Sequence, residues 1–550
     1  MPDFESPLSE PEHHDPYSRT LEDVQEPPKG FWPTFRQLGP GMILAGSIVG
    51  SGELIMTTKL GAVAGFVLLW FLLLSCFIKV VVQAELARHT ISSGQTFLEM
   101  FNQLPGPATL RPVWLGLPWM SIVVTASVLG TAIFVQLDTR WQTGMMALVV
   151  AAGVVFVSII AGGLLASRER SSDIPIERPM VNWFMWLWLV AILLTFVNSG
   201  AILGAVGQTL EMAMPGFIGA GGARVWAIGV AVLAALILIV GSYQSLEKTL
   251  VVLVSAFTFL TLVCTVLLQW TGFAITWDDI QQGMLFQFPD PLTTTVALTA
   301  LAMYAGTGVA YGEMWNYTYW CVEKGYARNV GVKQDDEAWS RRARGWIRVM
   351  YTDVLVTMVV YTVSTVCFYF LGAAILHAQG LDPDGSETIA TLSAIFTDSL
   401  GGWAATLFVV GSFFVLFSTV LAGVAGSSRL MTDALGVMGI INRNDYRTRL
   451  RFIRIFVIFL LVMFTIAYWL FANPPQMLGV TSSIIGAMMY PVLGLGVLYL
   501  RYFKVDPSIR PGRWTTGWLW VCGLALAVIS PAGILLTLAI QFNWISIGSG

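Results

Sequence analysis

Charged residues are scarce in this sequence. Asp, Glu, Lys and Arg make up 11% of its 550 residues, whereas soluble domains contain about 25%. Hydrophobic residues account for 56%, and the mean hydropathy is +0.71. So few charges cannot cover a water-exposed surface, which excludes a large soluble protein. Apolar runs of about 20 residues recur along the chain, each long enough to cross a bilayer as a helix. The sequence therefore predicts an all-α, multi-pass membrane protein.

Cysteine and histidine are also rare. The five cysteines occur singly, without C-x-x-C spacing, which argues against a zinc site or a redox pair. The four histidines are predicted to lie outside the apolar segments, so no histidine-built metal site is expected inside the membrane. The sequence has no P-loop and no catalytic-triad motif, which argues against an ATP-driven pump and against an enzyme. We expect no cofactor and no nucleic-acid partner, only a transported substrate and the lipid bilayer.

The apolar segments predict the domain organisation. Residues 1–35 are polar and acidic, lack an apolar signal-peptide core, and are expected to form a disordered cytoplasmic tail. Residues 36–550 are expected to form a single transmembrane transporter domain. Its predicted spans lie near 36–60, 61–86, 114–136, 145–167, 181–211, 223–243, 248–272, 293–325, 347–377, 401–433, 452–472, 475–502 and 514–541.

The distribution of charge predicts how these spans are oriented. Lys and Arg gather in loops 324–348 and 429–451, whereas loops 273–291 and 378–400 contain several acidic residues and no Lys or Arg. Positively charged loops are retained in the cytoplasm. We therefore expect a plasma-membrane protein with a cytoplasmic N-terminus and an external C-terminus.

Two apolar segments contain helix breakers followed by a carboxylate. Gly50-Ser51-Gly52 precede Glu53 in the first span, and several glycines precede Glu313 in a later one. A carboxylate at membrane depth is costly unless it is used. Paired interruptions of this kind indicate a substrate site near the bilayer midplane. The expected substrate-binding residues are Gly50, Ser51, Gly52, Glu53, Gly308, Ala310, Tyr311, Gly312 and Glu313. The alternative is a glycine-lined packing seam in which Glu53 is neutral and hydrogen-bonded.

Other polar residues in the spans give weaker signals. Asp353 opens the span after the basic loop and is a possible proton carrier. Lys79 is expected to lie beside a short turn, where snorkelling explains it. The hydroxyls of Ser418-Thr419 and of 481–483 either contact substrate or bond helix to helix.

At the interrupted segments the sequence resembles the Nramp family of divalent-metal transporters. The resemblance runs through Gly39-Pro40-Gly41, residues 50–53 and Leu68-Leu69-Trp70, and it resumes near Gly306, at 351–354 and at 417–420. It implies the LeuT-type fold, a 5+5 inverted repeat with discontinuous first and sixth core helices and about 11–13 transmembrane helices. Because the family usually has eleven spans, residues 114–167 are expected to be an inserted hairpin.

The binding motifs depart from the family pattern. The resemblance places the metal-ligating Asp and Asn of the family on Gly50 and Glu53. It places the Met, Pro and His of the second motif on Ala310, Tyr311 and Gly312. The acidic proton-pathway positions fall near 196–199, where no carboxylate occurs.

The leading hypothesis is a transporter of divalent cations. Glu53 and Glu313, together with freed backbone carbonyls, would form an oxygen-rich site for a hard ion such as magnesium or manganese, with little or no proton coupling. The alternative is a carrier of a small organic solute, whose pocket Tyr311 and Trp315 would line. A third possibility is a membrane sensor on the same fold, which the lack of a large soluble domain disfavours.

Overall fold

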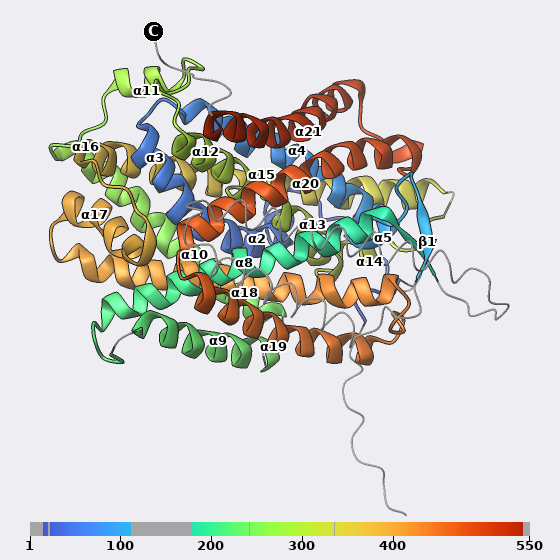
Figure 1. The fold of residues 1–550 in the computed structure, drawn as a ribbon. Helices are drawn as coiled ribbons and strands as arrows, with labels where there is room; N and C mark the ends of the chain where they lie inside the picture. Colours follow the sequence, from blue (N-terminus) through green and yellow to red (C-terminus); the bar gives the residue numbers. More distant parts are fainter. Residues whose placement is uncertain are drawn as a thin grey trace, which may run out of the picture.

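The computed structural model describes residues 15–19, 23–111, 179–219, 221–240, 243–334 and 336–542. These residues form long helices that pack side by side in one bundle (Figure 1). Eight of the described helices are long and apolar enough to cross a membrane. The expected all-α architecture is confirmed. All expected spans outside 114–167 coincide with described helices, whereas the predicted hairpin lies outside the described residues.

The described helices form two sets that each begin with an interrupted span. In the first set, α2 (Pro40–Ile48), the π-helix η1 (Gly52–Thr57) and α3 (Thr58–Ala64) make the interrupted span, followed by α4 (Leu69–Ser93), α8 (Trp183–Ala213), α9 (Gly222–Val240) and α10 (Tyr243–Leu267). In the second set, α12 (Thr294–Gly306) and α13 (Tyr311–Glu323) are followed by α15 (Glu337–Leu371), α18 (Ala404–Val437), α19 (Tyr446–Phe471) and α20 (Pro474–Phe503). A final helix, α21 (Arg513–Gln541), packs on α20.

Short elements connect these helices. They are α1 (Phe31–Phe35), α5 (Phe97–Phe101), η3 (Leu268–Trp270), α11 (Trp277–Gly283), α14 (Tyr326–Val330), η4 (Gly372–Leu376), α16 (His377–Gln379), η5 (Gly385–Glu387), α17 (Thr388–Leu400) and η6 (Pro507–Ile509). Strands β1 (Ala108–Leu110) and β2 (Met180–Asn182) pair antiparallel, with Ala108 opposite Asn182. Residues 108–110 and 180–182, which flank the long gap in the described chain, therefore lie side by side.

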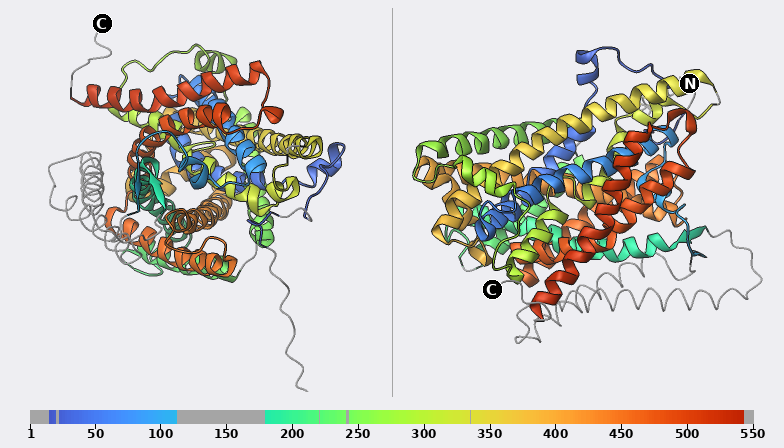
Figure 2. Two further views of the ribbon diagram at one scale, coloured as in Figure 1. Left: turned by 90° about the vertical axis from the view of Figure 1, so that its right-hand side faces the viewer. Right: turned by 90° about the horizontal axis from the view of Figure 1, so that it is seen from above.

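The interrupted helices lie at the centre of the bundle. α2 packs against α10, α13, α15 and α18, and every residue of η1 is buried. α8 contacts α9, α18, α19 and α20, which makes it the main scaffold helix on the other side of the breaks. The view along the bundle shows blue helices at its centre, surrounded by helices from the rest of the chain, and a further dark-blue segment at its edge (Figure 2). Both breaks are thus shielded from lipid by protein, as unwound backbone at membrane depth requires.

The predicted C-terminal ends of the first two spans, near residues 60 and 86, were wrong. The first span continues to Ala64 and turns at Gly65, whose φ of 60° suits glycine. α4 continues to Ser93, so His89 is buried within a helix instead of lying outside one. The predicted span stopped near the first charged residues because their pairing was not visible in sequence. In the structure Glu85 pairs with Arg88 and Arg501, each at 3.3 Å.

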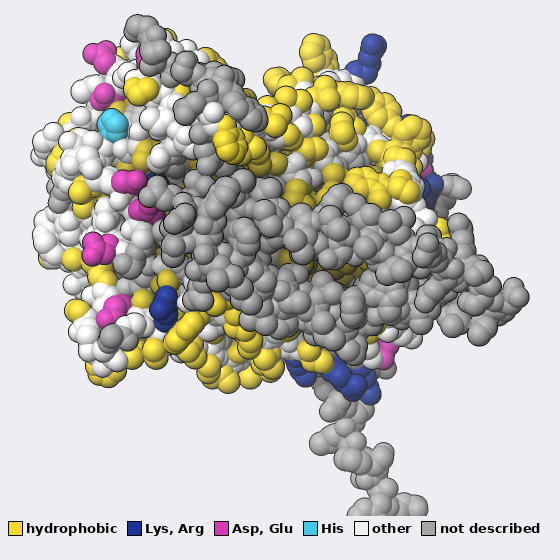
Figure 3. All heavy atoms as spheres, viewed as in Figure 1, with side chains coloured by type: hydrophobic (Ala, Val, Ile, Leu, Met, Phe, Trp, Pro, Cys, Tyr) yellow, Lys and Arg dark blue, Asp and Glu magenta, His cyan; other side chains and the backbone are white. Residues whose placement is uncertain are grey.

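Acidic and basic loops lie at opposite ends of the bundle. At one end, Lys59 Nζ lies 2.9 Å from Asp382 Oδ1. At the other end, Lys333 lies 2.7 Å from Asp506 and holds the pKa of that carboxyl down to about 2. In Figure 3 the acidic side chains gather on the left, and most Lys and Arg side chains lie on the right and lower right. The loops that share a charge in the sequence therefore share an end of the molecule.

The described part of the N-terminal tail is held against the basic end. Tyr17 Oη donates to Glu323 at 3.0 Å. The Gln25 backbone donates to Asn329 O and accepts from the indole of Trp346 at 2.9 Å. These described residues of the tail therefore have long-range partners that the sequence does not reveal.

Candidate functional site

The first break follows α2. The helix ends at Ile48, and the chain resumes as a π-helix at Gly52. A Cβ on Gly52 would lie 2.4 Å from Gly306 O in the second break, and one on Gly50 would lie 1.7 Å from Thr419 Oγ1. Glycine is therefore required here because the two breaks and α18 approach the backbone closely.

The second break separates α12 from α13. Thr307 is extended, and Gly308 has a φ of 59°, in the left-handed region that favours glycine. The backbone N–H of Gly308 donates to Glu53 Oε1 at 2.9 Å. The two breaks that the sequence predicts are thus present and in contact.

Glu53 joins the two breaks. Its Oε1 also accepts from Thr365 Oγ1 at 3.3 Å, and its Oε2 accepts a weak bond from Gly50 N at 3.4 Å. The side chain is fully buried. The carboxyl group therefore bonds to backbone amides freed by the breaks. This agrees with the hydrogen-bonded Glu53 of the packing-seam alternative.

Lys79 is the residue at the breaks that the sequence interpretation missed. It lies within α4, is fully buried, and its Nζ donates to Tyr304 O at 2.8 Å and to Thr307 O. Snorkelling beside a turn is therefore the wrong explanation. The signal in the sequence was a lone Lys among the apolar residues 76–82, more than a turn from either end of the helix.

A cavity of about 90 Å³ lies beside the breaks. Glu313 is the one carboxylate among its described lining residues, and its Oε1 accepts from Ser47 Oγ at 2.9 Å. Of the residues predicted to bind substrate, the cavity is lined by Ser51, Gly52, Gly308, Ala310, Tyr311, Gly312 and Glu313, whereas Gly50 and Glu53 are not among its lining residues.

Neutral hydroxyl and amide groups supply most of the remaining polar side chains in the described lining. Asn198 on α8 donates to Thr481 Oγ1 at 2.9 Å and to Ser482 Oγ at 2.8 Å, and Thr419 on α18 donates to Ser47 O at 3.3 Å. The polar lining residues that the sequence interpretation did not place in the site are Ser47, Thr195, Asn198, Ser199, Asn316 and Ser427. Hydroxyl and amide side chains in apolar helices are also the pattern of ordinary helix-to-helix bonding.

Asp353 lies at the start of α2 and away from the cavity. Its Oδ2 accepts from Gly41 N at 2.6 Å and from Tyr317 Oη at 2.8 Å, and its Oδ1 accepts from Gly39 N at 3.2 Å. These are the orphan amides of a helix N-terminus, so the carboxylate caps the first half-helix.

The described lining of the cavity has few sulfur ligands for a metal ion and no cluster of acidic, His or Cys side chains. Met56 is the one sulfur-bearing residue in the lining, whereas Met314 is buried elsewhere. The part of the chain that the structure describes contains no group of three or more His, Cys, Asp or Glu residues able to hold a metal. Any ion in the cavity would therefore bind one carboxylate, neutral oxygens and its own water.

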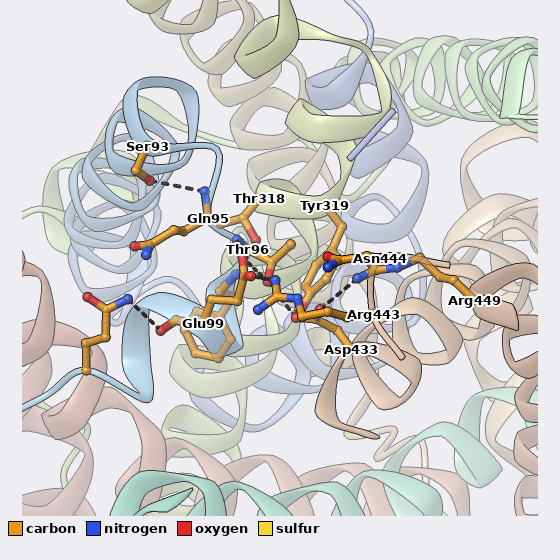
Figure 4. Close-up of polar contacts among 12 residues, drawn as sticks. Ser93, Gln95, Thr96, Glu99, Thr318, Tyr319, Asp433, Arg443, Asn444 and Arg449 are labelled. Atoms are coloured by element: carbon orange, nitrogen blue, oxygen red, sulfur yellow. Dashed lines mark hydrogen bonds and ion pairs between the residues drawn. The ribbon is translucent and has the colours of Figure 1, made fainter. Parts of the chain in front are cut away.

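A buried polar network closes the basic end of the bundle (Figure 4). Asp433 on α18 is fully buried and accepts from Thr96 Oγ1 at 2.5 Å, from Tyr319 Oη at 2.9 Å and from Arg449 at 3.2 Å. Arg443 pairs with the neighbouring Glu99. The network ties α5, α13, α18 and α19 together, so it links the half-helix that carries Glu313 to the scaffold.

The described helices form the LeuT-type fold of multi-pass membrane transporters. The crystal structure of the Eremococcus coleocola manganese transporter, in complex with an aromatic bis-isothiourea compound, matches with a TM-score of 0.58 and 13% identity, over 96% of this chain and 92% of that chain. A single-residue variant of that transporter matches with a TM-score of 0.55 and 14% identity over the same shares. Searching curated proteins finds no match.

The sequence also matches a family directly. The family described as natural resistance-associated macrophage protein-like, Nramp, matches residues 165–536, which is more than half of the chain. The chain belongs to the Nramp family.

Proposed function

We propose that this chain carries divalent metal cations across the membrane, with Glu313 as the principal anionic ligand. The observation that carries the proposal is the position of Glu313, whose carboxylate lines a cavity otherwise polar through neutral oxygens. Carboxylate, carbonyl and water oxygens suit magnesium and manganese. Membership of the Nramp family and the likeness to a manganese transporter support the same substrate class.

The size of the cavity favours an ion that keeps part of its water. Its volume of about 90 Å³ is several times the roughly 10–15 Å³ that one water molecule needs. Magnesium gives up its water reluctantly and is usually held by one or two carboxylates. A site with a single carboxylate therefore fits a partly hydrated magnesium or manganese ion better than a fully dehydrated one.

The carboxylates available for proton coupling are few. Glu53 and Asp353 each accept backbone N–H bonds that hold a helix end. These bonds tie both carboxyl groups to backbone amides, so we infer that neither exchanges protons with the substrate. Among the described lining residues, Glu313 is then the one carboxylate that can exchange protons with the substrate, so we propose that metal uptake moves few protons.

Uptake by purified protein in liposomes tests this function. Vesicles containing a metal-sensitive dye are offered manganese, and wild type is compared with Glu313→Gln and with Lys59→Gln. Lys59 lies at the acidic end in a pair with Asp382, so its substitution controls for the loss of a buried charge. We expect Glu313→Gln to reduce uptake at least about tenfold while the control transports normally. Manganese uptake at the wild-type rate by Glu313→Gln would refute the proposal.

A small organic cation is the second candidate substrate. The rings of Tyr311 and Trp315 line the cavity with Glu313, and their centroids lie 5.3 Å apart. Aromatic faces and a carboxylate attract organic ammonium ions. Uptake of labelled methylammonium, uninhibited by manganese, would favour this function over metal transport.

We also propose that the basic end faces the cytoplasm of a plasma-membrane protein. The clustering of loops 324–348 and 504–512 at one end supports this orientation, since Arg344 Nε donates to Ser508 O at 3.0 Å. Labelling of single cysteines placed in loop 324–348 and at the C-terminus should show opposite sides. Labelling of both from the same side would contradict it.

A further inference from the structure

The ammonium group of Lys79 occupies the end of a broken helix. α12 ends at Gly306, and in a continuous helix Tyr304 O would accept from the N–H four residues later, that of Gly308. That N–H instead donates to Glu53. Tyr304 O is thereby released, and Lys79 Nζ bonds to it at 2.8 Å and to Thr307 O beyond it.

The surroundings of the ammonium are those of a cation site. The C-terminal end of a helix carries partial negative charge, and freed carbonyls at such breaks are ligands for small cations. Ser75 Oγ bonds to the same Tyr304 carbonyl at 3.4 Å, and the Tyr304 ring centroid lies 5.6 Å from Nζ. Lys79 is fully buried, and Glu53 accepts from the N–H of the same peptide unit whose carbonyl, Thr307 O, bonds to the ammonium.

We propose that this position is a monovalent-cation site that the protein fills permanently with its own lysine. The ligands are the carbonyl oxygens of Tyr304 and Thr307, with the charge of Glu53 nearby. The class of ion that would bind if the ammonium were removed is a small monovalent cation, such as sodium, potassium or methylammonium. Because the tethered ammonium already balances the charge, the native protein needs no such ion to hold the break.

Thermal unfolding of the purified full-length protein tests the site without reference to the transported substrate. Wild type, Lys79→Ala and Lys79→Met are compared in sodium, potassium, methylammonium and choline chloride at equal ionic strength. Alanine opens space at the carbonyls, methionine refills most of it without charge, and choline is too large to enter. The readout therefore separates failure of this proposal from failure of metal transport.

We expect the unfolding midpoint to depend on the cation in Lys79→Ala alone. For Lys79→Ala, the unfolding midpoint should lie at least about 3 °C higher in one or more small cations than in choline and should saturate with concentration. Wild type and Lys79→Met should show no such difference. An equal response in Lys79→Met, or none in Lys79→Ala, would overturn the proposal.

Folding itself also discriminates. If Lys79→Ala is recovered folded only when it is purified in a small cation, the site is supported. If it fails to fold in every cation while Lys79→Met or the charge-retaining Lys79→Arg folds, no free ion replaces the ammonium and the proposal is wrong. Failure of all three variants in every cation would overturn it as well, because the position would then require lysine itself.

Discussion

Glu53 and Lys79 take the two halves of one missing helical hydrogen bond. Glu53 accepts from Gly308 N–H at 2.9 Å, and Lys79 donates to Tyr304 O at 2.8 Å. Both charged residues belong to the first set of helices, whereas the bond they replace belongs to the second. An interruption at membrane depth is thus satisfied by two buried side chains, one accepting from the freed N–H and one donating to the freed carbonyl.

This relationship predicts different roles for the two glutamates. Glu53→Gln replaces one acceptor oxygen by an NH₂ group facing backbone N–H donors, which leaves a buried donor unsatisfied at a cost of about 1–3 kcal/mol. Glu53→Gln should therefore lower thermal stability, whereas Glu313→Gln should keep it and lose manganese uptake. Scanning fluorimetry and liposome uptake on both variants measure the two effects. Loss of uptake by Glu53→Gln at unchanged stability would instead indicate direct binding by Glu53.

The glycines of the breaks predict a graded effect of alanine. Gly52→Ala would place a Cβ 2.4 Å from Gly306 O, and Gly308→Ala would put alanine at a φ of 59°. The left-handed conformation alone costs about 1–2 kcal/mol. Gly312 is the matched control, because a Cβ there meets nothing within 4 Å.

We expect Gly52→Ala and Gly308→Ala to lower the unfolding midpoint and Gly312→Ala to leave it near wild type. Thermal unfolding in detergent measures all three. Equal midpoints across the set would show that the two breaks relax freely and do not hold a fixed geometry.

The fold and the breaks were predictable, and the orientation of charged side chains was not. Glycine runs beside Glu53 and Glu313 indicate interrupted helices from local sequence alone. Whether Glu53 faces the cavity depends on Gly308, which lies 255 residues away in sequence. The same limit applies to Lys79, since the apolar pattern around it gives no depth within the bundle. Single polar residues such as Asn198 are equally consistent with packing until their partners are known.

The buried network at the basic end predicts a stability defect. Asp433 accepts three hydrogen bonds, one of them from Arg449. Removing one partner of a buried ion pair costs about 3–5 kcal/mol because the other charge is left uncompensated. Asp433→Asn should therefore lower the unfolding midpoint strongly, and Arg443→Gln, at the half-exposed pair with Glu99, should lower it much less. Similar midpoints for both variants would mean that the network is hydrated.

Metal selectivity and proton movement give the last prediction. Thioether sulfur favours soft metals, and Met56 is the one sulfur-bearing side chain in the described lining of the cavity. A single thioether among oxygen ligands favours cadmium only weakly. We therefore expect the apparent affinities for manganese and magnesium to lie within about tenfold of that for cadmium. Met56→Leu, which keeps the volume, should reduce cadmium uptake selectively, and Met314→Leu, buried away from the cavity, is the control.

The same vesicles measure the proton movement. Loaded with a pH-sensitive dye, they should show little acidification during manganese uptake, because Glu53 and Asp353 are engaged by backbone amides. Acidification that is stoichiometric with uptake would contradict this part. If it disappears in Glu313→Gln together with uptake but persists in Asp353→Asn, Glu313 carries both the metal and the proton. Strong cadmium preference that survives Met56→Leu would show that Met56 is not the ligand that favours cadmium.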